Sequence, residues 1–279
     1  MIDNAQVQEL KSIARKMRLE IVKMMGPNKP HHFGGSLSEV EIVTSLYFYK
    51  MRYHPSDPQW PDRDRFVMSK GHSVPAQYVA LAFKGVFPYE YLGQLKTLGA
   101  CLQGHPCMKT PGIEACTGSL GQGLSFANGI ALAARLLRKN FRVYVLLGDG
   151  ELQEGQVWEA MMNSSARKLD NLVAIVDRNH LESQGSTEDS KPLEPLRLKW
   201  EAFGWHVLEV NGHDIKQICD ALDTAETIKG KPSVILADTV KGKGVSFIEG
   251  DYRFHNAPLT PQQYEQAIKE LEAALEGEN

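Results

Sequence analysis

The sequence predicts an α/β fold with a mostly parallel central sheet and helices on both of its faces. Residues 142–147 and 172–177 are short apolar runs that stop at polar turns, which indicates two buried strands. An amphipathic stretch over residues 157–166 lies between them, so this part of the chain alternates strand, helix and strand. Such alternation is typical of parallel sheets.

The other expected elements continue the alternation along the chain. They are a helix over residues 5–25, a strand over 66–68, a helix over 124–134, strands over 205–210 and 233–238 with a helix from about 214 between them, and a last helix from 260. After the first helix, Gly34 and Gly35 indicate a loop, and Ser36 or Ser38 is expected to cap the helix that follows.

The composition is that of a soluble globular protein. The 279 residues are 42% hydrophobic and 23% charged, and this length fits one α/β domain or two small ones. A formal net charge of −3 argues against nucleic-acid or membrane-surface binding, because no basic excess exists to neutralise phosphates. The four cysteines lack Cys-x-x-Cys spacing, and the first residues lack the apolar segment of a signal peptide. We therefore expect a cytoplasmic protein with reduced thiols and no nucleic-acid or membrane partner.

Oxygen-bearing residues follow the two central strands where each strand ends. Gly148-Asp149-Gly150 comes after the first strand, and Asn179 follows the second. Because the carboxyl ends of parallel strands meet at one edge of the sheet, Asp149 and Asn179 can converge. Carboxylate, amide and carbonyl oxygens suit Mg²⁺ or Ca²⁺ rather than zinc, and magnesium leaves positions for phosphate oxygens. The alternative is an ordinary Gly-rich turn with a helix-capping aspartate.

The combination of Gly148-Asp149-Gly150 with Asn179 resembles the thiamine-diphosphate motif, and residues 148–155, Gly-Asp-Gly-Glu-Leu-Gln-Glu-Gly, resemble its transketolase version. Other segments resemble transketolases in the same order: His32 before a Gly-rich turn, Ser-Lys-Gly-His at 69–72, Gly-His-Pro at 104–106, Gly-Ser-Leu-Gly-Gln-Gly at 118–123 and His-Asn-Ala-Pro-Leu at 255–259. The resemblance spans about residues 5–260. It implies a thiamine-diphosphate-binding fold.

The resemblance also implies a set of site residues. It places Mg²⁺, with Ca²⁺ or Mn²⁺ as possible substitutes, on Asp149, Asn179 and the backbone carbonyl of Leu181. The cofactor thiamine diphosphate is expected to contact His72, Gly118, Leu120, Gly148, Asp149, Gly150, Glu154, Asn179 and His255. The expected catalytic residues are His32, His72, His105 and His255. These histidines would act as hydrogen-bond donors and proton relays, with pKa values near neutrality.

Some residues depart from the family pattern or fall outside it. Arg178 stands where an acidic residue or Asn is common, which puts the local loop geometry in doubt, and Gln184-Gly185 stands where Asp-Gly is common. His31 matches no family residue and is expected on the surface. Lys241 lies in a basic Gly-rich loop that could close over phosphate, although we expect it to be exposed to solvent.

The family also has parts that this chain does not match. In transketolases, the glutamate that activates the cofactor and the pyrimidine-binding and C-terminal domains lie beyond the region of resemblance. We therefore expect residues 1–279 to be a single diphosphate-binding domain that needs a separate C-terminal transketolase subunit, in an α₂β₂ assembly. Glu154 would help to orient the partner's glutamate, or would be only a first-turn charge of a helix.

The implied activity is transfer of a two-carbon ketol unit from a ketose or ketose phosphate to an aldose. One alternative is a subunit of a related synthase, similar to deoxyxylulose-phosphate synthase. Another is a regulatory half that binds magnesium and diphosphate without turnover.

Overall fold

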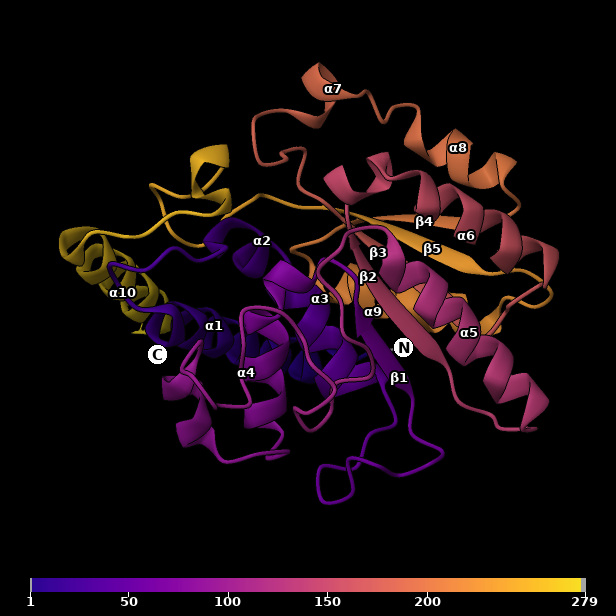
Figure 1. Ribbon diagram of the computed structural model, residues 1–279, viewed down its shortest axis with the longest axis horizontal. Helices are drawn as coiled ribbons and strands as arrows, with labels where there is room; N and C mark the ends of the chain where they lie inside the picture. The colour runs from indigo at the N-terminus through magenta and orange to yellow at the C-terminus, as the bar shows by residue number, and fades with distance from the viewer. Residues whose placement is uncertain (1, 277–279) are drawn as a thin grey trace.

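The computed structural model describes residues 2–276 and has a five-stranded parallel sheet at its centre (Figure 1). The strands are β1 (Arg65–Met68), β2 (Val143–Gly148), β3 (Leu172–Arg178), β4 (His206–Asn211) and β5 (Ser233–Asp238). Their order across the sheet is β1-β2-β3-β5-β4, and every neighbouring pair is parallel. The predicted parallel α/β fold is confirmed.

Helices connect and cover these strands. The α-helices are α1 (Asn4–Met25), α2 (Phe33–Ser38), α3 (Val40–Ser45), α4 (Pro75–Phe83), α5 (Gln122–Leu136), α6 (Gly155–Ala166), α7 (Thr187–Ser190), α8 (Leu196–Ala202), α9 (Ile215–Thr227) and α10 (Pro261–Glu276). Short turns of other helix types are η1 (Leu46–Lys50), η2 (Gly71–Ser73), η3 (Tyr89–Gln94), η4 (Gly150–Gln153) and η5 (Tyr252–His255). None of the helices within residues 2–276 combines the length and the apolar character needed to cross a membrane.

The sheet separates two hydrophobic cores. Along β2, Tyr144 and Leu146 face the core formed with α1, α3, α4, α9 and α10, whereas Val143, Val145 and Leu147 face the core formed with α5, α6 and α8. Burial on both faces explains why the central strands are continuous apolar runs rather than alternating ones. The charged residues of the fully buried strand β3, Asp177 and Arg178, accordingly lie at its carboxyl end.

The expected loop at Gly34 and Gly35 is wrong, because both glycines lie inside α2. Helix α2 starts directly after His32, and all six of its residues are buried. A Cβ atom on Gly34 would lie 2.9 Å from Cγ of Lys241, so the glycine lets α2 pack tightly against that side chain. Ser36 and Ser38 both lie inside α2 and the N-cap of α3 is Glu39, so neither hydroxyl caps the next helix. The Ser38 hydroxyl has other partners. It donates to the Gly35 carbonyl at 3.0 Å and to Asp177 at 2.5 Å.

Candidate active site

A cavity of about 220 Å³ lies at the carboxyl end of the sheet, where β2 and β3 stop. Its lining includes predicted cofactor and metal residues from several parts of the chain, namely His72, Leu120, Gly148, Asp149, Gly150, Glu154, Asn179, Leu181 and His255. A larger open cleft of about 840 Å³ lies beside β4 and β5, and none of the predicted site residues lines it. The smaller cavity is therefore the candidate active site, because it is the one of these two that the predicted site residues line.

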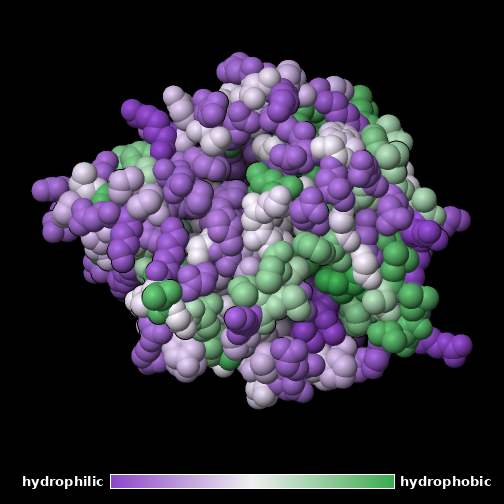
Figure 2. Space-filling model, in the orientation of Figure 1, coloured by the Kyte–Doolittle hydropathy of each residue, from purple (hydrophilic) through white to green (hydrophobic). Residues whose placement is uncertain are grey.

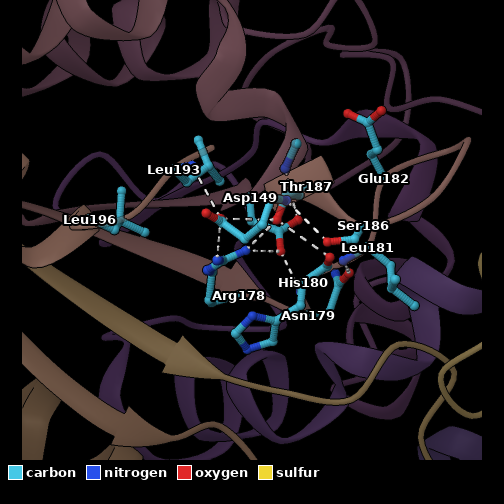
Figure 3. Close-up of polar contacts among 12 residues, drawn as sticks. Asp149, Arg178, Asn179, His180, Leu181, Glu182, Ser186, Thr187, Leu193 and Leu196 are labelled. Carbon is cyan, nitrogen blue, oxygen red and sulfur yellow. Dashed lines mark hydrogen bonds and ion pairs between the residues drawn. The ribbon is translucent and has the colours of Figure 1, made fainter. Parts of the chain in front are cut away.

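Asp149 lies at the end of β2 and is 2% exposed. Its carboxylate accepts hydrogen bonds from the backbone N–H of Gly150 at 2.8 Å and of His180 at 2.6 Å (Figure 3). Burial raises the pKa of Asp149, and the nearby Asp177 carboxylate adds to the rise. Because burial disfavours the ionised form of the Asp149 carboxyl, a cation beside it would stabilise that form.

Asn179 and Leu181 bring the other two predicted metal-binding oxygens to the same cavity. The Asn179 side-chain oxygen accepts from the Leu181 N–H at 3.2 Å, and the Leu181 carbonyl accepts from the Lys241 ammonium at 2.8 Å. The Leu181 carbonyl oxygen thus faces a cationic group in the cavity. Within residues 2–276, no three or more His, Cys, Asp or Glu side chains are grouped to hold a metal ion. A cation here would rest on carboxylate, amide and carbonyl oxygens, which fit Mg²⁺.

The four predicted catalytic histidines form one cluster although they come from four distant segments. The ring of His32 lies 4.8 Å from that of His72, 5.4 Å from that of His255 and 6.4 Å from that of His105, measured between centroids. The His72 and His255 rings are 5.1 Å apart. Gly118 lies against His105, because a Cβ atom on Gly118 would be 2.8 Å from Cδ2 of that ring.

The expectation of histidine pKa values near neutrality is wrong for this cluster. Burial is the largest cause, and it lowers the pKa of His32 to about 4 and that of His255 to about 3. Positive charge on Lys96 lowers the value for His32 further, and Lys241 does so for His255. Burial also lowers the pKa of His72 and of His105. The rings are therefore neutral at pH 7 and can each donate one hydrogen bond and accept another.

This electrostatic arrangement predicts a loss of stability in mild acid. In the unfolded chain His32 and His255 bind protons below about pH 6.5, whereas in the folded chain they stay neutral down to about pH 4 and about pH 3, respectively. The unfolded state then holds more protons, so the free energy of unfolding falls as pH falls through this window. We expect the Tm measured by calorimetry to drop between pH 7 and pH 5, and the drop to be smaller in His255→Asn. An equal drop of Tm in His255→Asn would contradict the attribution of this acid-induced loss of stability to His255.

Two buried lysines are functional candidates that sequence reasoning did not select. Lys241 is 2% exposed, so its expected exposure to solvent is wrong. Burial lowers its pKa to about 8, against the opposing effect of Asp149, and its ammonium lies 3.1 Å from Nδ1 of His255. Lys70 is also 2% exposed and lines the cavity. In the Ser-Lys-Gly-His segment that contains Lys70, the family resemblance gives a role only to the histidine.

A buried glutamate organises the Gly-rich turns around the cavity. Glu151 accepts hydrogen bonds from the backbone N–H groups of Gly121 at 2.9 Å and Gly148 at 3.0 Å, and from Ser69 at 2.5 Å. Gly121 has a φ of +84°, and a Cβ atom on it would lie 2.9 Å from Cβ of Glu154. Only glycine fits both conditions. The turn that carries Leu120 is thus held beside the predicted cofactor residue Glu154.

Arg178 connects the candidate metal ligand to the segment around α7. Its guanidinium lies 3.3 Å from Asp149 and donates to Thr187 at 2.7 Å (Figure 3). It also donates to Glu188 at 2.8 Å and to Glu194 at 3.2 Å. The arginine that departs from the expected pattern is 5% exposed and ion-paired. It therefore engages one carboxylate oxygen of the candidate ligand Asp149, while Asp149, Asn179 and Leu181 all line the cavity. The His31 side chain is also buried, at 3% exposed, contrary to the expected surface position.

Comparisons with known proteins agree with this geometry. The sequence model of the family described as "Transketolase, thiamine diphosphate binding domain" matches residues 8–275. The chain is 46% identical to the 6-deoxy-6-sulfo-D-fructose transketolase subunit SqwG of Clostridium sp. (strain MSTE9), with 95% of this chain and 96% of the relative covered. It is 44% identical to one subunit of the apulose-4-phosphate transketolase of Phocaeicola vulgatus, with 97% of this chain and 96% of that subunit covered.

Among solved structures, the chain superposes on the transketolase from Leishmania mexicana with a TM-score of 0.88 at 33% identity. The superposition covers 96% of this chain but only 41% of that one. The chain thus spans nearly the full length of the two subunit relatives and less than half of this transketolase.

Proposed function

This chain belongs to the transketolase family, and from this premise we propose that it is the N-terminal subunit of a two-chain enzyme that transfers a two-carbon ketol unit from a ketose to an aldose. The observation that carries the proposal is the convergence of the oxygen ligands after β2 and β3 at one cavity, beside a cluster of four neutral histidines of which His72 and His255 line that cavity. Residues 8–275 match one domain of the family, which supports a single diphosphate-binding domain. Four free cysteines are consistent with our assignment to the cytoplasm.

We assign Mg²⁺ to Asp149, Asn179 and the Leu181 carbonyl, and the diphosphate of thiamine diphosphate to the same cavity. The cofactor supplies the electron sink that lets the bond between C2 and C3 of a ketose break. Lys241 and His255 reach this cavity and would bind phosphate oxygens. An anion beside them would raise the pKa of both groups.

The histidine cluster would hold the sugar and move its protons. A neutral imidazole can accept a proton from one hydroxyl and donate to another, which suits a reaction in which hydroxyl and carbonyl groups exchange roles. His32 contacts the other three rings, so we place it at the centre of the relay.

The partner would be a C-terminal transketolase subunit that docks on α5 and α6, in an α₂β₂ assembly. Phe126 on α5 is 44% exposed and Met162 on α6 is 55% exposed. Figure 2 shows an apolar area at the lower right, where Figure 1 places α5. A cavity of about 460 Å³ in this area is lined mainly by apolar residues. Because Leu120 and Glu154 lie at the start of these helices, a partner docked here would also cover the cofactor cavity.

We expect Phe126→Glu to weaken binding to the partner subunit by about 10-fold or more, since an exposed aromatic at an interface centre often dominates binding. The Tm of the isolated chain should not change, because the side chain packs in no core. Leu198→Glu is the matched control, since this leucine on α8 is 59% exposed and is not among the residues that line the 460 Å³ cavity. Calorimetric titration of the two purified subunits measures the binding affinity of each variant. Equal weakening by the two variants would place the interface elsewhere.

The test of the proposed function is a ketol-transfer assay with thiamine diphosphate and Mg²⁺, run on this chain alone and mixed with a C-terminal subunit encoded beside it. We expect activity only in the mixture. The donor panel includes xylulose 5-phosphate and the substrates named for the subunit relatives, 6-deoxy-6-sulfo-D-fructose and apulose 4-phosphate. Turnover by this chain alone would contradict the two-chain proposal. Cofactor binding by the mixture with no turnover of any donor would favour a regulatory half.

A further inference from the structure

Behind the candidate metal site lies a buried aspartate to which sequence reasoning gave no role. Asp177 is the last residue but one of β3 and is 0% exposed. Its carboxylate receives hydrogen bonds from the Lys70 ammonium, the Ser38 hydroxyl and the Thr239 hydroxyl. These donors come from the ends of β1, α2 and β5. Asp177 is thus the point where four elements meet below the cavity.

A fourth donor to Asp177 is the side chain of Asn179. The Asn179 amide nitrogen lies 3.0 Å from Oδ2 of Asp177. An ionised carboxylate can only accept hydrogen bonds, so the nitrogen rather than the oxygen of the amide must face it. The Lys70 ammonium and the Ser38 and Thr239 hydroxyls also donate to this carboxylate, so all of these contacts require it to accept. The amide oxygen is left to point toward Leu181 and the cavity.

We propose that Asp177 is a positioning residue, which fixes the orientation of the Asn179 amide so that its oxygen faces the divalent cation. This inference rests on the proposed magnesium site. An asparagine ligand has two ends of similar shape, and only the oxygen binds a metal. A turn of the amide by half a revolution would present its N–H₂ group to the cation. Groups that orient a metal ligand typically contribute about 10- to 100-fold to metal affinity.

Glu39 provides a matched control within the same cluster. It is 0% exposed, and its carboxylate lies 2.7 Å from the Lys70 ammonium, but no contact joins it to Asn179. Burial raises the pKa of Glu39, and glutamine keeps the size and shape of its side chain. Glu39→Gln and Asp177→Asn therefore each remove one carboxyl partner of the same lysine. Only Asp177→Asn changes the hydrogen bond to Asn179.

The experiment measures binding of thiamine diphosphate to the full chain, with and without the partner subunit, as Mg²⁺ is titrated. For Asp177→Asn we expect the Mg²⁺ concentration at half-saturation to rise by about 10-fold or more. For Glu39→Gln we expect a change of less than about 3-fold. Wild-type-like Mg²⁺ affinity of Asp177→Asn would overturn the inference. An equal loss in Glu39→Gln would also overturn it, because the effect would then act through Lys70.

A second variant exchanges the two groups. In Asp177→Asn/Asn179→Asp the net charge is unchanged, and the new ligand is a carboxylate, whose two oxygens are equivalent and need no orientation. Lys70 keeps the Gly35 carbonyl and Glu39 as partners, which supports folding. We expect the exchange to recover most of the lost Mg²⁺ affinity. A folded double variant that binds Mg²⁺ no better than Asp177→Asn would overturn the inference.

Two further results separate this inference from the proposed function. A wild-type complex that binds no thiamine diphosphate at any Mg²⁺ concentration would overturn the proposed function, and this inference with it. A crystal structure of the wild-type complex with Mg²⁺ and thiamine diphosphate needs no variant. In it we expect the Asn179 amide nitrogen to donate its hydrogen bond to Asp177. If that nitrogen instead donated to another group, the result would overturn this inference but not the proposed function.

Discussion

Asp149→Asn is expected to raise the Mg²⁺ concentration needed for thiamine diphosphate binding by more than about 100-fold, beyond the typical effect of an orienting residue. Asparagine removes the negative charge that the cation would meet and keeps the size of the side chain. Arg178 retains Glu188 and Glu194 as ionic partners, so the variant should fold. Calorimetric titration with Mg²⁺ and thiamine diphosphate, together with a Tm, measures affinity and folding separately.

Asp170→Asn is the matched control for this prediction. Asp170 lies just before β3, at the opposite end of the sheet from the cavity, and pairs with Arg135 at 2.9 Å. We expect its Mg²⁺ requirement to equal that of the wild type. If Asp149→Asn also kept the wild-type requirement, Asp149 could not be a metal ligand.

His32→Asn is expected to lower kcat/KM for ketol transfer by about 100- to 10,000-fold, the usual contribution of a positioned proton-transfer group. The effect should fall mainly on kcat, while the Mg²⁺ requirement stays unchanged because His32 does not line the metal cavity. The variant should also lose less stability in mild acid, since the pKa of His32 is lowered to about 4 in the folded chain.

His54→Asn serves as the control for this substitution. His54 is exposed, packs against Trp60 at 4.5 Å between ring centroids and is not among the residues that line the cofactor cavity. It should have wild-type kcat/KM. Full activity of His32→Asn would remove His32 from the relay and leave the other three histidines to account for proton movement.

The sheet could be predicted from the sequence because burial on both faces leaves a simple pattern. Residues 172–176 are apolar without interruption, and β3 covers them together with Asp177 and Arg178. The position of Asp149 and Asn179 at one edge follows from parallel strands alone. The resemblance to transketolases supplied the histidines, and their convergence around His32 could not be derived from spacing, because each lies on a separate segment.

Local chemistry that depends on packing could not be predicted. Gly34 and Gly35 disfavour a helix in isolation, yet the tight approach of α2 to Lys241 outweighs that preference. The same approach buries Lys241, which its Gly-Lys neighbours alone suggest is exposed. The histidine pKa values depend on burial and on lysines distant in sequence. The positioning role that we propose for Asp177 depends on its contacts with Ser38, Lys70 and Thr239, which come from distant parts of the chain.

The antiparallel bridge between His31 and Ala257 has a consequence for the order of folding. Two backbone hydrogen bonds of 3.2 Å join these residues, which places the segment of His255 beside that of His32. The contact closes a loop of most of the chain, and such non-local contacts form slowly because their entropy cost precedes their energetic reward. The histidine cluster should therefore assemble late, after the sheet. Partly folded chains would then have a formed hydrophobic core before the four histidines come together.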